Sequence, residues 1–322
     1  MMKIDNDALN RAVKLLQEGN LVAIPTETVY GLAADASNPK AIQKIYTAKG
    51  RPSHNPLIIH LPNRAAMSSY AINIPNTAWQ LAEAFWPGPL TLILQKHPNV
   101  PSIVTANQDT VALRVPNHPI TLELLRRFKG GLAAPSANRS GRISPTQAEH
   151  VQEELGSHVD FILDGGPCQV GIESTIVLVT DSNVTILRQG AITATLLARY
   201  VKVQETHHSK TIVPGNDLSH YAPSKPLYLL KKEALLDRVK HNSNQPSFSV
   251  LSFMEKPELL HHSAECLKWR VATKDPLSFA QNLYANLRAL DQPPSECILI
   301  EMPPTEEAWL AIMDRLTRAA VK

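Results

Sequence analysis

Residues 21–32 read LVAIPTETVYGL, an apolar run that passes directly into polar side chains. The apolar residues 21–24 predict a short buried strand, and Pro25 ends it because proline cannot donate a hydrogen bond to a neighbouring strand. The segment 25–32 therefore lies just past a strand end, which is where open α/β sheets place ligands. A threonine-rich turn without a ligand is the alternative interpretation.

The flanking sequence predicts an α/β fold. Before the strand, Leu9, Ala12, Val13 and Leu16 recur at helical spacing, and Gly19 follows where a helix C-terminal glycine belongs. After it, helical patterns and strand-like runs alternate, which indicates a sheet covered by helices. The helical patterns lie near residues 40–48, 77–86, 119–128 and 145–155, and the strand-like runs lie at 90–95, 111–115, 161–163, 175–179 and 184–187.

The regular pattern stops near residue 203, and polar residues, proline and glycine dominate as far as residue 226. We interpret this stretch as a linker. Strand and helix patterns alternate again through residues 227–322, which predicts a smaller Rossmann-like unit with a parallel sheet. That unit lacks a glycine fingerprint, so we assign no nucleotide to it. The predicted division is a first domain at 1–202, a linker at 203–226 and a second domain at 227–322.

Composition excludes several classes of protein. The 322 residues exceed one average domain, and 43% hydrophobic with 19% charged residues is ordinary for a globular chain. Three widely separated cysteines favour neither a disulfide framework nor a metal site, which fits a reducing compartment. The N-terminal residues lack a signal-peptide layout and no apolar run reaches membrane-spanning length, so we expect a cytoplasmic protein with no membrane partner.

The common nucleotide and hydrolase motifs are absent: there is no GxxxxGK[ST], GxGxxG, GxSxG or HExxH. The basic turn KGRP at 49–52, followed by Asn55, nevertheless suits an anion such as a triphosphate, because arginine forks two oxygens and lysine adds a point charge. A solvated basic turn at a helix end explains the same residues equally well. His60, taken alone, is more typical of a buried, hydrogen-bonded imidazole.

Further segments place polar side chains at strand ends. Arg114 interrupts the apolar strand TVALRV, where it must either face solvent or hold a carboxylate. In AAPSANRSG at 133–141, small residues let a ligand approach the backbone while serine and asparagine supply hydrogen bonds. Ser144, just beyond, also fits an ordinary helix N-cap. GIEST at 171–175 and LRQG at 187–190 complete the set, and each segment alone is weak support for a site.

Together these segments closely resemble the YrdC/TsaC-type threonylcarbamoyl-AMP synthases. The resemblance spans roughly residues 8–200 and is carried by PTETVYGL, KGRP with Asn55 and PLIIH, LRVPNH, PSANRSG, GIESTI and LRQGAI, in that order. The linker motif SHYAP at 219–223 and the appended α/β unit resemble the two-domain branch of the family. The resemblance implies a twisted, open mixed α/β sheet with a concave basic pocket, followed by a Rossmann-like domain.

Matching motif positions imply two sets of contacts in the first domain. The implied L-threonine contacts are Thr28, His60, Arg114, Ala134 through its backbone, and Ser174. The implied ATP contacts are Lys49, Arg51, Asn55, Thr110, Ser136, Asn138, Ser144 and Arg188, with Tyr221 lying over the pocket as part of a linker lid. Lys49 and Arg51 would be the catalytic pair that neutralises the triphosphate. Mg2+ would enter with ATP, and no tightly bound metal held by the protein is expected.

The implied reaction joins L-threonine, bicarbonate or CO2 and ATP into threonylcarbamoyl-AMP and pyrophosphate, for the threonylcarbamoyl modification of tRNA position 37. The threonine amine captures the carbon, and the resulting carbamate attacks the α-phosphate, so no protein nucleophile is needed. Positioning and electrostatic stabilisation would supply the catalysis. The implied partners are the three substrates, a downstream tRNA threonylcarbamoyl-transferase complex and weakly bound RNA.

Two other functions are considered. A double-stranded RNA or tRNA-binding module is disfavoured by the net charge of only +3 and by 5% aromatic residues. Another carbamoyl or adenylyl transferase of the same fold, as in hydrogenase-maturation proteins, would bring acylphosphatase and zinc-finger modules that this sequence lacks. In the second domain, His261, His262 and Cys266 have no fourth metal ligand nearby. That domain is either a regulatory or lid-anchoring unit or a simple stabilising appendage, and we expect it to hold the linker against the pocket.

Overall fold

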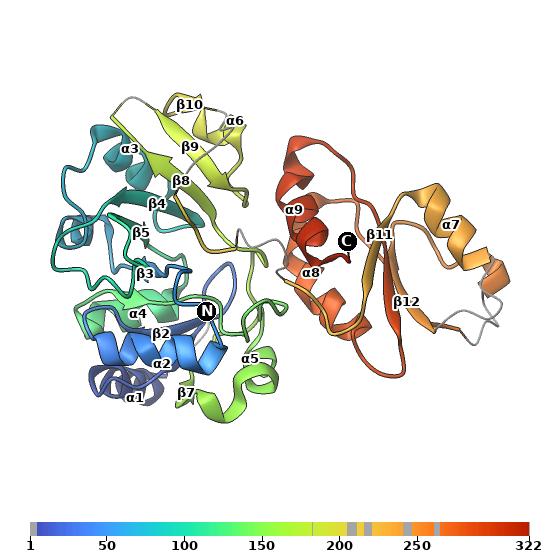
Figure 1. Cartoon of the computed structure of the whole chain (residues 1–322), viewed down its shortest axis with the longest axis horizontal. Coiled ribbons are helices and arrows are strands. Elements are labelled where there is room, and N and C mark those ends of the chain that lie inside the picture. The colour runs from blue at the N-terminus through green and yellow to red at the C-terminus, as the bar shows by residue number, and fades with distance from the viewer. Residues whose placement is uncertain are drawn as a thin grey trace. The chain divides into compact units, whose positions relative to one another are not determined.

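The structure, a computed structural model, describes residues 5–181, 183–204, 211–215, 221–240, 247–260 and 265–321. The chain forms two compact units (Figure 1). The first comprises Met1–Ser140 and Ser144–Asn216, and the second comprises Gly141–Ile143 and Asp217–Lys322. The short segment Gly141–Ile143 therefore interrupts the sequence of the first unit and belongs to the second.

Among the described residues, the first unit is built on a ten-stranded mixed sheet in the order β10-β9-β8-β4-β5-β3-β6-β2-β1-β7. The strands are β1 (Val22–Ile24), β2 (Gly31–Asp35), β3 (Ile58–His60), β4 (Leu90–Gln95), β5 (Thr110–Arg114), β6 (Leu132–Ala133), β7 (Phe161–Ile162), β8 (Thr175–Val179), β9 (Val184–Arg188) and β10 (Val203–Gln204). β3 runs parallel to β5 and β4 parallel to β8, whereas β4 and β5 are antiparallel. The predicted α/β class and mixed sheet are confirmed.

Five of the six α-helices described in the first unit lie where the apolar periodicity predicts them, whereas the last, a four-residue helix, was not predicted. They are α1 (Asn6–Gln17), α2 (Pro39–Lys49), α3 (Asn76–Phe85), α4 (Pro119–Phe128), α5 (Ala148–Leu155) and α6 (Ala194–Leu197). α2 begins because the Asn38 side chain accepts hydrogen bonds from the first backbone N–H groups, and it ends at Gly50, whose φ of 58° turns the chain away. This glycine places the KGRP turn directly at the helix end.

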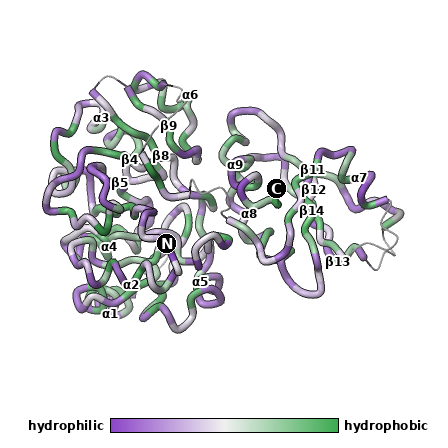
Figure 2. The backbone as a smooth tube through the Cα atoms, viewed as in Figure 1, coloured by the Kyte–Doolittle hydropathy of each residue, from purple (hydrophilic) through white to green (hydrophobic). Residues whose placement is uncertain are grey.

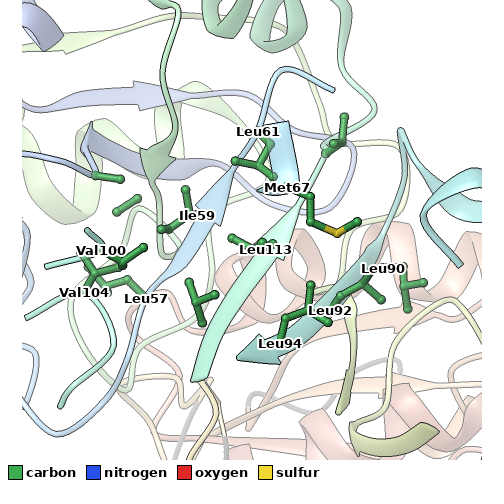
Figure 3. Packing of buried hydrophobic residues seen from close by; sticks show 14 of the residues in the cluster. Leu57, Ile59, Leu61, Met67, Leu90, Leu92, Leu94, Val100, Val104 and Leu113 are labelled. Carbon is green, nitrogen blue, oxygen red and sulfur yellow. The ribbon is translucent and has the colours of Figure 1, made fainter. Parts of the chain in front are cut away.

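The main core lies on one face of the sheet. Leu57, Ile59 and Leu61 belong to it, and Figure 3 shows Leu57 beside Val100 and Val104 and Ile59 beside Leu113. Because side chains alternate along a strand, the residues between them point to the other face. On that second face, a smaller apolar cluster consists of Ile58, Ile93, Ala112, Ile176 and Val213.

The second unit has a four-stranded parallel sheet in the order β11-β14-β12-β13. Its elements are β11 (Leu227–Leu230), α7 (Lys232–Lys240), β12 (Phe248–Ser252), β13 (Cys266–Val271), α8 (Pro276–Leu290), β14 (Cys297–Glu301) and α9 (Leu310–Ala319). Figure 2 shows hydrophobic residues along β11, β12 and β14 and hydrophilic ones on α7. The predicted parallel sheet is confirmed, but the sequence pattern misses β13, because this edge strand exposes most of its side chains.

No helix in the described part of the chain is both long enough and apolar enough to cross a membrane.

Candidate active site

Several sequence-predicted residues meet on the second face of the first-unit sheet, at the carboxyl ends of β3 and β5. His60 and Arg114 are direct neighbours across these two parallel strands. Both follow the alternation that places Ile58 and Ala112 on this face. Residues 211–215 cover part of the same face, because Val213 packs into the apolar cluster and is only 1% exposed.

Arg114 is buried and is held by three groups of the protein. Its Nε donates to the Gly88 carbonyl (3.2 Å), its Nη1 donates to Thr28 Oγ1 (3.0 Å), and its Nη2 lies 2.7 Å from Glu27 Oε1. The other oxygen of Glu27 accepts from the Asn117 backbone N–H (3.0 Å). Arg114 therefore holds a carboxylate, as one of the two sequence alternatives predicts, but this carboxylate belongs to the protein. Two of its five N–H groups remain for a ligand.

Thr26 explains why Thr28 points toward Arg114. The Thr26 hydroxyl donates to the Val29 carbonyl (2.6 Å) and accepts from the backbone N–H groups of Thr28 and Val29 (3.2 Å each). The two threonine hydroxyls lie 2.9 Å apart. The segment after β1 is thus a closed turn whose hydroxyls form a short buried chain leading to the guanidinium.

His60 is a neutral imidazole. It is only 3% exposed, and burial, followed by the nearby charge of Arg114, lowers its pKa to about 3. An uncharged ring can both donate and accept a hydrogen bond. At neutral pH this position therefore offers a polar group without a second positive charge beside Arg114.

Lys49 fixes the PSANRS segment. Its Nζ donates to the carbonyls of Ser136 (2.6 Å) and Asn138 (2.5 Å), and the Ser140 backbone N–H donates to the Lys49 carbonyl (2.8 Å). Burial, followed by the charge of Arg51, lowers the pKa of Lys49 well below its usual value. The lysine that ends α2 therefore ties the small-residue segment after β6 to the basic turn.

Arg51 closes that turn on itself. Its Nη2 donates to Asn55 Oδ1 (2.7 Å) and to the Pro56 carbonyl (2.8 Å), and its Nε donates to the Asn55 carbonyl (3.1 Å). Arg51 is only 8% exposed. The solvated-turn interpretation does not fit this burial, and the anion-binding interpretation stays a prediction.

A second cluster lies at the ends of β8 and β9. Arg188 donates through Nε and Nη2 to the Ser174 carbonyl (3.1 and 2.9 Å) and through Nη1 to the Pro214 carbonyl (2.9 Å). The Ser174 hydroxyl lies 2.8 Å from Thr91 Oγ1. Arg188 thus connects the GIEST segment to residues 211–215, which cover the site face.

Two buried carboxylates were not predicted as site residues. One is Glu27, and the other is Glu173, whose Oε1 accepts from the Ser144 hydroxyl (2.6 Å). The signal available in the sequence was a charged residue between apolar or hydroxyl neighbours directly after a strand. Such a residue must be paired when buried. Ser144 consequently serves as this hydrogen-bond donor, and α5 begins later, at Ala148.

The predicted residues are not all brought together. Ala134 lies beside β3, where its backbone N–H donates to the Ile58 carbonyl (3.0 Å). Thr110 begins β5, four residues from Arg114, so their Cα atoms are roughly 13 Å apart along the strand. Tyr221 belongs to the second unit, where it stacks on Tyr284 with ring centroids 5.9 Å apart. Ser219, His220 and the pair at 261–262 lie outside the described residues.

The described residues contain no group of three or more His, Cys, Asp or Glu side chains placed to hold a metal ion.

Comparison with known proteins identifies the family to which both units are similar. The domain family described as "Telomere recombination" (Sua5/YciO/YrdC) matches residues 14–190, and "Threonylcarbamoyl-AMP synthase, C-terminal domain" matches residues 187–321. A threonylcarbamoyl-AMP synthase of Bacillus subtilis is 39% identical over 99% of this chain and 94% of its own length. One of Pyrococcus abyssi is 35% identical over 99% and 95%. The crystal structure of P. abyssi Sua5 with L-threonine superposes with a TM-score of 0.88 at 33% identity, covering 98% of this chain and 95% of that one.

Proposed function

The chain belongs to the threonylcarbamoyl-AMP synthases, and we propose that it makes its product on the sheet face that carries His60 and Arg114. The protein is accordingly an enzyme, an ATP-using transferase of tRNA modification. The observation that carries the assignment of the face is a buried guanidinium with two spare N–H groups beside a neutral imidazole. That pair suits an amino acid, whose carboxylate needs a cation and whose amine must stay unprotonated to react.

L-threonine would bind with its carboxylate on the spare N–H groups of Arg114. A bidentate guanidinium–carboxylate contact fixes both position and orientation. Thr28 and Ser174 would contribute hydroxyl groups, His60 would contribute a neutral ring nitrogen, and Ala134 would contribute its backbone. The P. abyssi structure, which was solved with L-threonine, supports an amino-acid site in this fold.

ATP would bind along the basic turn and the segment that Lys49 holds. Lys49 uses two of its three N–H groups on the carbonyls of Ser136 and Asn138. Its third N–H and the guanidinium of Arg51 would face the triphosphate, whose negative charge favours the protonated lysine. The remaining nucleotide contacts would come from Asn55, Thr110, Ser144, Arg188 and, from the linker lid, Tyr221.

Mg2+ would be bound chiefly through the phosphate oxygens of ATP, which is how this ion usually enters nucleotide sites. Its chemical contribution when bound would be to neutralise charge on the phosphates. The chain's own contribution is the pair Lys49 and Arg51, which are held in place by neighbouring carbonyls and by Asn55.

In the proposed reaction the neutral threonine amine attacks bicarbonate, and one water leaves, or it attacks CO2, and the amine releases one proton to solvent. A carbamate oxygen then attacks the α-phosphorus of ATP, the bond to the β-phosphate oxygen breaks, and pyrophosphate departs. No side chain forms a covalent bond. The residues act by holding the two substrates in line and by stabilising the charge that develops on phosphate.

Residues 211–215 would shield this labile intermediate from water. Val213 is already buried on the site face and Pro214 is bound to Arg188. Excluding water strengthens the electrostatic contacts and prevents hydrolysis of a carbamate. The lid role of Tyr221, which belongs to the second unit, stays a prediction. The functional division into catalytic domain, linker and second domain remains a prediction, as do the cytoplasmic location, weak RNA binding and transfer to a downstream tRNA threonylcarbamoyl-transferase.

The test is pyrophosphate release from ATP, omitting L-threonine and bicarbonate in turn and comparing Arg51→Ala with Arg64→Ala. Arg64 is a matched control because, among the residues that the structure describes, its side chain forms only an exposed ion pair with Glu83 (3.3 Å). We expect release to need both co-substrates, to collapse in Arg51→Ala and to persist in Arg64→Ala. Release that does not need threonine would point to another acyl acceptor. No release from folded protein that binds RNA would favour the RNA-binding alternative.

A further inference from the structure

The second unit contains a cavity of about 400 Å3 at the carboxyl ends of its parallel strands. Each strand supplies the residues that end or follow it: Lys232 after β11, Phe253 and Met254 after β12, Lys274 after β13, and Glu301 and Met302 at the end of β14. The cavity is therefore formed by the sheet as a whole and not by one irregular loop.

The cavity also lies where the sheet topology changes direction. The chain leaves β12 toward β13 on one side, whereas it leaves β14 through α9, which packs against β11 on the other side. β12 and β14 are adjacent strands, so the segments that leave their carboxyl ends in opposite directions leave a crevice between them. In open parallel α/β sheets, this switch point is the place where ligands bind.

Glu301 carries a charge into this crevice. Its side chain is 7% exposed, and Oε2 accepts from the Ser252 hydroxyl (2.5 Å) and the Phe253 backbone N–H (2.9 Å). Oε1 has no hydrogen-bond or ion-pair partner among the described residues. The carboxylate as a whole is buried, and charged groups in such places are usually bound by donors. Glu301 lines the cavity, so a ligand hydroxyl or N–H can donate to its carboxylate.

The other lining residues include two exposed lysines, which are positively charged, and a buried aromatic ring, which offers a flat surface. Lys232 and Lys274 are exposed and line the cavity as point charges suited to phosphate. Trp309 forms a buried wall, packed edge-on against Phe253 (centroids 5.7 Å apart). A ligand that satisfies all three features has an anionic end, a planar body and a hydroxyl donor between them.

We propose that this cavity binds a mononucleotide, with its phosphate at Lys232 and Lys274, its base against Trp309 and its ribose hydroxyls on Glu301. The volume is at the lower end for organic ligands, which suits a mononucleotide better than a dinucleotide and exceeds what a free amino acid requires. No glycine-rich loop cradles the phosphate, as the sequence indicates, so the lysines supply its charge contacts. This inference is independent of the proposed catalytic function.

The test uses methionine-methyl NMR on the full chain, titrated with AMP. The chain has six methionines, and Met254 and Met302 line the cavity. Met67 lies in the core of the first unit and serves as an internal reference. The signals of Met254 and Met302, assigned with Met254→Leu and Met302→Leu, should shift on addition of AMP. They should still shift in Arg51→Ala, which separates this site from nucleotide binding in the first unit.

Charge reversal at the two cavity lysines tests the phosphate contacts, and charge reversal at a lysine away from the cavity is the matched control. Lys232→Glu and Lys274→Glu should each raise the AMP concentration at the titration midpoint by roughly tenfold or more, because a charge-assisted contact is lost. Lys240→Glu should leave the midpoint unchanged, since Lys240 is an exposed lysine at the other end of the same helix as Lys232. Equal shifts with inorganic phosphate alone, stronger shifts with L-threonine, or no shift with AMP would each overturn the proposal.

Discussion

Glu27 decides how Arg114 is presented to a ligand. The pair is 2.7 Å apart and both side chains are 4% exposed, so replacing one partner leaves a buried charge. We expect Glu27→Gln to lower the free energy of unfolding by about 3 kcal/mol. L-threonine should restore more stability in this variant than in the wild type, because its carboxylate takes the place of Glu27. Urea unfolding with and without L-threonine measures both effects.

Glu83→Gln is the control for that substitution. Glu83 forms an ion pair with Arg64, and their side chains are 71% and 52% exposed. An ion pair this exposed contributes at most about 1 kcal/mol to the free energy of unfolding. The response of Glu83→Gln to L-threonine should match the wild type. If Glu27→Gln gains no more from threonine than Glu83→Gln does, Arg114 does not bind the substrate carboxylate.

His60 should make the enzyme less stable in weak acid. Its pKa is about 3 in the folded protein and ordinarily 6.5, so below pH 6.5 the unfolded chain binds more protons than the folded one. The contribution of neutral His60 to the free energy of unfolding is fully present above pH 6.5 and is lost progressively as pH falls toward 3. Between pH 6.5 and 5 it amounts to about 2 kcal/mol.

His60→Gln should abolish this part of the pH dependence, and chemical denaturation at pH 7 and pH 5 measures it. His158→Gln, at an exposed position, should behave like the wild type. If the free energy of unfolding falls as much between pH 7 and pH 5 in His60→Gln as in the wild type, the ring is not buried in its neutral form.

At the scale of elements, residues 211–215 act as a strap across the site face. Val213 is buried among Ile58, Ile93, Ala112 and Ile176, whereas its neighbour Ile212 is 47% exposed. We expect Val213→Ser to loosen the strap, because a buried hydroxyl lacks a partner there, and to lower kcat/KM for L-threonine roughly tenfold. Ile212→Ser should change little, since its hydrogen bonds to Gln108 use only the backbone.

Steady-state kinetics of both variants, with hydrolysis of ATP followed in parallel, check this prediction. A loosened strap should also raise the fraction of ATP consumed without product. Equal kinetics for the two variants would mean that the strap is only structural.

At the scale of the whole molecule, Asp291 contacts two segments of the second unit that are far apart in the sequence, 141–143 and 221–226. It accepts from the backbone N–H groups of Ser224 (2.7 Å) and Lys225 (2.9 Å) and lies 3.6 Å from Arg142. Arg142 belongs to Gly141–Ile143, which directly continues the segment held by Lys49. The second unit is therefore connected by sequence to the proposed nucleotide site.

We expect Asp291→Ala to speed hydrogen exchange at residues 141–143 and 221–226 and to lower kcat several-fold. Glu233→Ala, an exposed acid on α7, is the control and should leave both unchanged. Faster exchange without any loss of kcat would reduce the second unit to a stabilising appendage.

The sequence by itself determined the fold class and most elements, because apolar periodicity is a local property, and the site segments that it indicates by strand-end polarity stay predictions. It missed β13, whose exposed side chains leave no periodic signal. It could not pair Arg114 with Glu27 or assign the partners of Lys49, because these contacts join residues up to 89 positions apart. Burial, the lowered pKa of His60 and the cavity beside Glu301 likewise exist only once separate strands are packed side by side.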